Sequence, residues 1–235
     1  MTKRNYALDL IRSLAIFLMV IFHFIYDLKY FGWLTWDIPD GDGWKHFRYV
    51  ILTLFFICIG VSLVYSHAQQ IHPKKFIKRL AKVAIGAGII TLMSLVMFTQ
   101  NWIYFGVLHF ILIASLFAIL FVPYPKLSLL IGLCIITLAS LGVLDKRWPF
   151  YYFDEFLPSY TVDYVPLFPW LGVILLGISL AHSRWLNHDV LKLNNLKNDK
   201  LIRRLSWPGK HSLIIYLIHQ PLLFAVLTPI AWWVN

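Results

Sequence analysis

Residues 12–23 read RSLAIFLMVIFH, in which ten uncharged and mostly apolar residues separate an arginine from a histidine. The stretch fits a helix buried in lipid, where an ionisable side chain is costly and is therefore a candidate functional residue. A rise of 1.5 Å per residue puts Arg12 and His23 about 16 Å apart along such a helix. Eleven residues are close to three turns, so both side chains lie on a similar face. We therefore predict a membrane helix with two functional positions.

The remainder of the 235-residue chain has the composition of a polytopic membrane protein, with 60% hydrophobic and 14% charged residues. A soluble domain is nearer half apolar and one quarter charged. Apolar runs of about 17–25 residues, long enough to cross a bilayer, recur along the sequence. We predict an all-α bundle of about seven transmembrane helices, forming one domain over residues 1–235. The predicted spans are 7–27, 46–67, 82–99, 103–122, 127–144, 164–182 and 211–233.

Charge predicts the orientation of this bundle. With the N-terminus in the cytoplasm, fifteen lysines and arginines fall on the inner side and five on the outer side, as the positive-inside rule requires. Seven spans then place the C-terminus outside. The net charge of +10 is interpreted as a topology signal and an attraction to anionic lipid, not as nucleic-acid binding. The inner basic residues are Lys3, Arg4, Lys74, Lys75, Lys78, Arg79, Lys82, Lys126, Arg184, Lys192, Lys197, Lys200, Arg203, Arg204 and Lys210.

The predicted loops on the two sides differ in character. Inside, residues 72–82 and 184–210 are basic, which suits either contact with lipid headgroups or a binding surface for a phosphate-bearing ligand. Outside, residues 28–45 and 145–163 are rich in aromatic and acidic side chains. Such loops suit either carbohydrate binding or a lid at the membrane interface. The sequence leaves both pairs of alternatives open.

Titratable residues in the spans fall at two predicted depths. The outer group combines two histidines with two acids, in which Asp27 follows His23 by one turn and orients its ring. The inner group includes His219, which counting from the span boundary places about 12 Å below His23. A single membrane histidine is as often a packing residue, whereas two at one depth with acids nearby favour chemistry. The outer group is His23, Asp27, His109 and Asp163, and the inner group is Arg12, His211 and His219.

Arg12 allows a structural interpretation as well as a functional one. Its side chain can extend to the inner membrane interface or pair with Asp9, three residues earlier. Neither of these roles needs a histidine on the same face of the helix.

Three stretches carry a resemblance to a known family. They are residues 7–32, YFGVLHFI (104–111) with DYVPLFPWLGVILLGISL (163–180), and WPGKHSLIIYLIHQPLL (207–223). Together with the arginine and histidine of the first span, they resemble the bacterial branch of the heparan-alpha-glucosaminide N-acetyltransferase catalytic-domain family. The resemblance runs from the first span to the last. It departs from the family at Ser13, where glycine usually follows the motif arginine.

The resemblance implies a transmembrane acyltransferase of the bacterial inner membrane. Such an enzyme takes an acetyl or other acyl group from acyl-CoA in the cytosol and delivers it to a sugar or amino-sugar acceptor outside. It implies that Arg12 serves the donor and His23 the reaction. Acetyl-CoA is the expected donor substrate, and no metal or haem is expected. His109, Asp163, His211, His219 and Gln220 match further positions of the family pattern.

We therefore expect the head of coenzyme A to bind at the cytosolic side and its thin arm to reach His23. His23 acts either as a general base or as a carrier of the acyl group, with Asp27 or His109 orienting it or carrying the proton. The expected catalytic residues are His23, Asp27, His109 and Asp163. The expected donor-binding residues are Arg12, His211, His219, Gln220, Lys74, Lys75, Arg203, Arg204 and Lys210.

Two other classes of protein remain open at this point. A transporter or proton-coupled carrier also uses buried arginine, aspartate and histidine, although no inverted repeat is visible in the sequence. A haem or quinone protein can pair His23 with His109 as ligands. The acceptor, the atom acylated, the acyl length and any homo-oligomer are not determined by the sequence.

Overall fold

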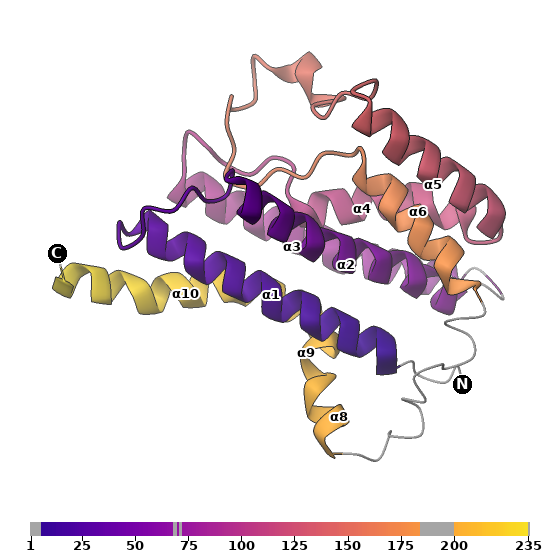
Figure 1. Ribbon diagram of the computed structural model, residues 1–235, viewed down its shortest axis with the longest axis horizontal. Helices are drawn as coiled ribbons and strands as arrows, with labels where there is room; N and C mark the ends of the chain where they lie inside the picture. The colour runs from indigo at the N-terminus through magenta and orange to yellow at the C-terminus, as the bar shows by residue number, and fades with distance from the viewer. Residues whose placement is uncertain (1–5, 68–69, 71, 184–199, 235) are drawn as a thin grey trace. The chain divides into compact units, whose positions relative to one another are not determined.

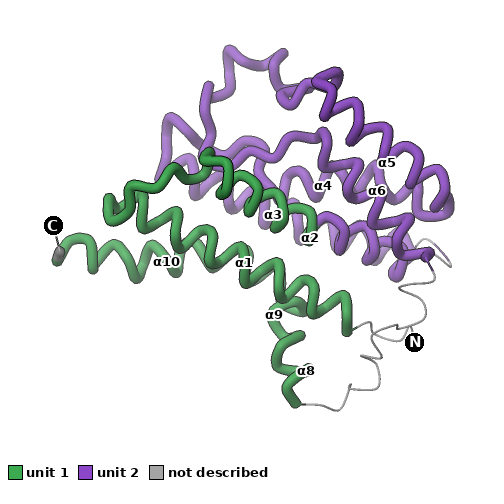
Figure 2. The backbone as a smooth tube through the Cα atoms, in the orientation of Figure 1, with its two compact units in different colours: residues 1–55, 191–235 green, residues 56–190 purple. Residues whose placement is uncertain are grey.

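The computed structural model describes residues 6–67, 70, 72–183 and 200–234. Regular structure in these residues is helical, and none of them belongs to a strand. The chain forms two compact units, residues 1–55 with 191–235 and residues 56–190 (Figure 2). Helix α2 (Asp42–His67) contributes its first part to one unit and its second part to the other. The organisation as a single domain stays a prediction.

The apolar helices coincide in sequence with the predicted spans (Figure 1), which confirms the all-helical class. Four are long and apolar enough to cross a membrane: α1 (Tyr6–Tyr30), α2, α3 (Pro73–Met97) and α10 (Ser212–Val234). Shorter ones are α4 (Val107–Ala118), continued by the 3-10 turn η1 (Ile119–Phe121), α5 (Pro125–Ser140) and α6 (Trp170–Ala181). The number of membrane crossings and the sides on which the termini lie stay predictions.

The largest differences between the predicted and the observed starts of the helices are at α3 and α6. α3 begins at Pro73, nine residues before the predicted span, because proline is well suited to the first turn of a helix. Most of the basic segment 72–82 is therefore helix and not loop. α6 begins at Trp170, six residues after the predicted start at 164, since Pro166 and Pro169 disfavour helix in the residues that precede them.

The unit that contains both ends of the chain is built on α1. This helix packs against α10 and against two short helices that come before α10 in the chain, α8 (Lys200–Leu205) and α9 (Trp207–Lys210). Met19 and Phe22 of α1 form a buried core with Ile38 of the following loop and Ile51 of α2.

α1 and α10 run in the same direction. Ser13 bonds to Gly209, and ten residues further along both segments the ring of His23 contacts that of His219. Contacts that advance together along both helices require parallel axes. Parallel first and last helices are what an odd number of spans predicts.

Glycines set the helix contacts of the unit formed by residues 56–190. A Cβ on Gly132 of α5 would lie 2.9 Å from the carbonyl oxygen of Gly172 on α6, and a Cβ on Gly172 would lie 2.7 Å from that of Gly132. On α6, a Cβ on Gly177 would lie 2.5 Å from the carbonyl oxygen of Ile57 in α2. Because glycine has no Cβ, the backbones of these helices approach closely, as they do at small residues between membrane helices.

We expect Gly177→Ala to destabilise the protein, because the new methyl group must displace the backbone of α2. Overpacking of this kind costs about 1–3 kcal/mol. Gly88→Ala on α3 is the matched control, since a Cβ there has open space and alanine favours helix by up to about 1 kcal/mol. Thermal unfolding in detergent should show a lower Tm for Gly177→Ala only; equal Tm values would contradict the close contact.

Candidate functional site

Two histidine rings meet where α1 packs against α10. The ring centroids of His23 and His219 are 4.7 Å apart, and the ring planes are inclined by 81°. Nδ1 of His23 lies 2.9 Å from the carbonyl oxygen of Met19, and Nδ1 of His219 lies 2.7 Å from that of Tyr216. A carbonyl oxygen only accepts hydrogen bonds, so Nδ1 carries the proton in both neutral rings. Each imidazole therefore keeps its basic lone pair on Nε2.

A carboxylate and an amide form a second pair between the same two helices. Nε2 of Gln220 donates a hydrogen bond of 2.7 Å to Oδ1 of Asp27, whose side chain is fully buried. Among the four side chains of these two pairs, three buried atoms have no hydrogen-bond partner within the described part of the chain: Oδ2 of Asp27, Oε1 of Gln220 and Nε2 of His219. Each such atom costs about 1–3 kcal/mol. His23, Asp27, His219 and Gln220 are called the polar cluster below.

His23 and Asp27 have different hydrogen-bond partners, and the predicted orienting role of Asp27 stays a prediction. The ring of His23 is held by the main chain of its own helix, and the partner of the Asp27 carboxylate is Gln220. A backbone carbonyl one turn earlier is always within reach of a helical histidine, so no carboxylate is needed to set its tautomer.

The predicted depth of His219 is also wrong, because its ring contacts that of His23 and does not lie about 12 Å below it. The prediction assumed that the first and last spans begin at the same level. In the structure Gly209 packs beside Asp9 and Ser13, so α10 begins roughly two to three turns along α1. This offset raises His219 to the level of His23.

Small residues join the N-terminal turns of α1 to α9. The hydroxyl of Ser13 donates to the carbonyl oxygen of Asp9 at 3.0 Å and accepts the N–H of Gly209 at 2.8 Å. A Cβ on Gly209 would collide with the carbonyl oxygen of Asp9. Only glycine permits this approach. Ser13, the departure from the family pattern, is therefore an anchor for α9.

Arg12 lies beside this anchor. Its Nη1 is 3.4 Å from Oδ1 of Asp9, and the Asp9 side chain is almost fully buried. The structural alternative for Arg12, pairing with an acid one turn earlier, is therefore present. A role of Arg12 in donor binding stays a prediction.

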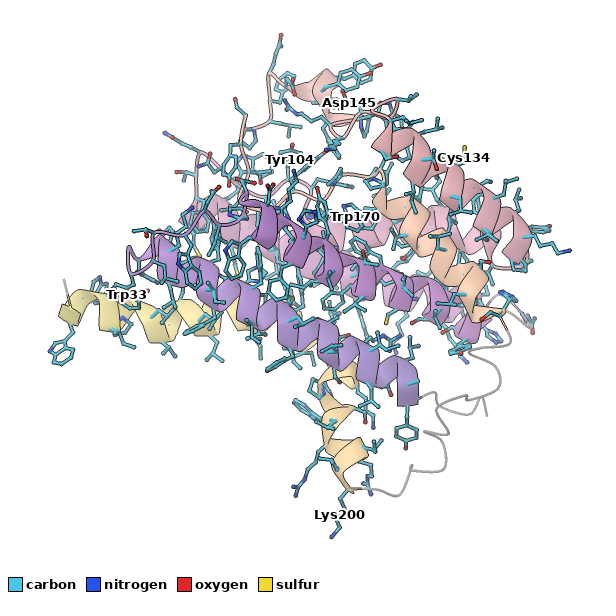
Figure 3. The ribbon with its side chains drawn as sticks, viewed as in Figure 1. Trp33, Tyr104, Cys134, Asp145, Trp170 and Lys200 are labelled. Carbon is cyan, nitrogen blue, oxygen red and sulfur yellow. The ribbon has the colours of Figure 1, made fainter. Side chains whose placement is uncertain are left out.

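A basic pocket lies at α8 and α9, next to the start of α1. Its volume is about 670 Å³. Lys210 Nζ also lies 5.5 Å from the ring centroid of Tyr6, the first residue of α1. Figure 3 labels Lys200, which opens α8. The lining residues are Lys200, Arg203, Arg204, Trp207, Pro208 and Lys210.

Three residues of the pocket, Arg203, Arg204 and Lys210, are predicted donor-binding residues. Lys200 lies in the predicted basic segment 184–210 but was not named for donor binding, and Trp207 was missed. The signal for Trp207 is the WPGK stretch, where a Pro-Gly pair follows a basic segment just before an apolar helix. His211 follows the pocket: its Nδ1 lies 3.0 Å from the carbonyl oxygen of Trp207.

His109 and Asp163 lie in the other unit, at the start of α4. Nδ1 of His109 accepts the N–H of Gly106 at 3.3 Å, and its Nε2 lies 3.1 Å from the hydroxyl of Thr91. Oδ2 of Asp163 accepts the N–H of Val107 at 3.2 Å, as a carboxylate at a helix N-terminus does. Both residues thus stabilise the first turn of α4. Their acid–base role stays a prediction.

The remaining basic residues of the expected donor site are dispersed. Lys74 and Lys75 are exposed on the first turn of α3, in the same unit as His109. Their participation in donor binding stays a prediction. Other basic residues on which the orientation rests lie outside the described residues: Lys3, Arg4, Arg184, Lys192 and Lys197.

The second aromatic loop packs part of its side chains and exposes the rest. Phe150 contacts Phe105 and Tyr104, with ring centroids 4.6 and 5.4 Å apart. Tyr152 and Phe156 are 68% and 79% exposed. A packed base with exposed rings suits both alternatives, the carbohydrate surface and the interfacial lid.

Apolar helices, a buried polar cluster and a basic pocket within one compact unit are typical of an integral membrane enzyme or carrier. The chain belongs to the family described as heparan-alpha-glucosaminide N-acetyltransferase, catalytic, whose model matches residues 4–221. This match confirms the resemblance of the motifs, indicates a membrane-bound acetyltransferase and does not favour a carrier. Comparison with curated proteins and with solved structures finds no significant match.

We expect Ser13→Ala to loosen α9 from α1, because the Gly209 N–H loses its acceptor inside the protein. The loss of one such bond costs about 1–3 kcal/mol. Limited proteolysis should cut the segment from residue 200 to 211 faster, and thermal unfolding should show a lower Tm. Ser140→Ala, at an exposed serine at the end of α5, is the control; identical behaviour of the two variants would contradict the anchor.

Proposed function

We propose that the protein transfers an acetyl group from acetyl-CoA on the cytosolic side of a bacterial inner membrane to a sugar hydroxyl or amine on the other side. One observation carries the proposal: α1 connects the basic pocket to the polar cluster within one compact unit. From Arg12 to His23 the helix rises about 16 Å. The pantetheine arm of coenzyme A is thin and flexible, and it extends over such a distance.

The basic pocket suits the head of coenzyme A. That head carries phosphates, which arginine binds in a bidentate manner and lysine as a point charge. The pocket offers Arg203, Arg204, Lys200 and Lys210, and its volume of about 670 Å³ is in the range of small-molecule sites. The Trp207 side chain is 55% exposed and offers a face on which the adenine ring can stack.

The polar cluster suits the transfer step. In direct transfer, Nε2 of His23 takes the proton of the acceptor hydroxyl or amine while the acceptor atom attacks the thioester carbonyl. The new bond forms between the acceptor atom and the carbonyl carbon, and the carbon–sulfur bond breaks. The thiolate of coenzyme A then receives the proton from the His23 imidazolium, which restores the neutral ring.

The carrier route uses the same atom. Nε2 of His23 attacks the thioester carbonyl, the carbon–sulfur bond breaks, and an acyl-imidazolium and the thiolate of coenzyme A form. The acceptor atom then attacks the acyl carbon, the bond from this carbon to Nε2 breaks, and the proton that the acceptor loses neutralises the thiolate. The bond from Nδ1 to the Met19 carbonyl fits both routes, because it leaves Nε2 as the nucleophilic or basic nitrogen. Labelled acetyl-CoA without acceptor distinguishes them, since only the carrier route leaves label on His23.

We expect His23→Ala to lower acetyl transfer at least about 100-fold, because positioned acid–base groups contribute about 10²–10⁴ to rates. Binding of acetyl-CoA, measured as thermal stabilisation, should persist. His46→Ala is the control, at an exposed histidine whose Nδ1 lies near the main chain of its own helix. Transfer by His23→Ala at the wild-type rate in proteoliposomes would remove His23 from the mechanism.

We expect the double variant Arg203→Glu, Arg204→Glu to weaken acetyl-CoA binding about ten- to hundredfold, as loss of charge-assisted bonds does. The effect should decrease with added salt, because both side chains are exposed. Lys126→Glu, at an exposed lysine on α5, should bind like wild type. Equal affinities for the double variant and the control would place the coenzyme elsewhere.

A further inference from the structure

We propose that the polar cluster is the subsite for the acceptor substrate, in which Asp27, His219 and Gln220 receive hydrogen bonds from hydroxyl or amine groups of the ligand. The inference rests on the proposed acyltransferase function and deepens it. It moves His219 and Gln220 from the donor side, where the sequence analysis places them, to the acceptor side of the reaction.

The hydrogen-bonding inventory of the cluster supports this assignment. Its donors are already engaged: the amide nitrogen of Gln220 bonds to Asp27, and Nδ1–H of each histidine bonds to a carbonyl of its own helix. The buried atoms of the cluster without a partner in the described chain are Oδ2 of Asp27, Oε1 of Gln220 and Nε2 of His219. The oxygens of Asp27 and Gln220 accept hydrogen bonds, and so does Nε2 of His219, because the proton of that ring is on Nδ1. The cluster therefore accepts hydrogen bonds from a ligand and has few free donors to offer it.

Burial makes this imbalance costly in the absence of a ligand. Asp27 is fully buried, and His219 is 8% exposed. A buried acceptor without a donor loses its bonds to water and gains nothing in return. Three such atoms on two adjacent helices are explained by a ligand that supplies the missing donors.

The chemistry of the two substrates decides which of them this ligand is. The reacting end of acetyl-CoA is a thioester, whose carbonyl oxygen is an acceptor and faces a carboxylate and an amide oxygen unfavourably; its N–H and O–H donors lie further back, on the pantetheine arm. A sugar presents O–H groups, and an amino sugar also N–H groups, at the reacting atom itself. The unpaired atoms of the cluster therefore match the acceptor substrate better than the thioester end of the donor.

The position of the cluster relative to His23 fits the same assignment. The His219 ring contacts that of His23, and Asp27 follows His23 by one helical turn. A hydroxyl or amine held by Asp27 and Gln220 thus lies close to the imidazole that removes its proton. The cluster binds and orients the nucleophile, while His23 carries the proton from it to the thiolate of coenzyme A.

The test measures both substrates with the full-length protein in proteoliposomes, using labelled acetyl-CoA and glucosamine as the acceptor probe. Asp27→Asn replaces one acceptor by a donor, and it should raise the KM for glucosamine about ten- to hundredfold. The KM for acetyl-CoA should stay within about twofold of wild type. Asp37→Asn, at an exposed aspartate of the loop after α1, is the matched control.

His219→Phe is the second variant, since phenylalanine keeps a ring against His23 and removes Nε2. It should raise the KM for glucosamine in the same way. The inference can therefore still be tested if Asp27→Asn does not fold. A raised KM for acetyl-CoA with an unchanged KM for glucosamine, in either folded variant, overturns the inference and leaves acyl transfer intact.

Failure of the proposed function has a different signature. If wild-type protein is neither stabilised by acetyl-CoA nor transfers its acetyl group, the acyltransferase proposal fails. Direct binding of glucosamine, followed by tryptophan fluorescence, then tests the subsite alone. Binding by wild type that Asp27→Asn loses supports the subsite, whereas no binding by wild type overturns it.

Discussion

The contact between Gly209 and the N-terminal turns of α1 is the constraint on which the candidate site depends. Within lipid there is little hydrophobic force between helices, so close backbone approach and hydrogen bonds hold them together. Glycine at position 209 lets α9 lie against the Asp9 carbonyl, and Ser13 bonds to its N–H. Because α10 continues directly from α9, this contact sets its height along α1. The register brings His219 to His23 and Gln220 to Asp27.

His109 and His219 differ in what their ring nitrogens bond to. Both nitrogens of His109 have partners in its own unit, and the residue stabilises the first turn of α4. His219 has one nitrogen on a backbone carbonyl and the other buried without a partner in the described residues. The first arrangement satisfies a polar group at low cost. The second retains an unpaired acceptor, which needs an explanation and which the proposed subsite supplies.

The two ends of α1 offer opposite chemistry. Near its start, Arg203, Arg204 and Lys210 present positive charge and hydrogen-bond donors. Three turns beyond Arg12, the polar cluster presents acceptors. In the proposed function, an anionic donor substrate is complementary to the first end, and an acceptor substrate with hydroxyl or amine groups is complementary to the second. Such a separation would favour each substrate at its own subsite.

The helices and their approximate limits follow from the sequence alone, because long apolar runs and prolines act locally on the backbone. The shared helix of Arg12 and His23 is equally local, since it needs only the geometry of one continuous helix. The pairing of His23 with His219 is not local. It depends on where α10 begins relative to α1, and that height is set by a contact between Gly209 and residues some two hundred positions away. Only the tertiary structure therefore decided which polar atoms meet and which are left without a partner.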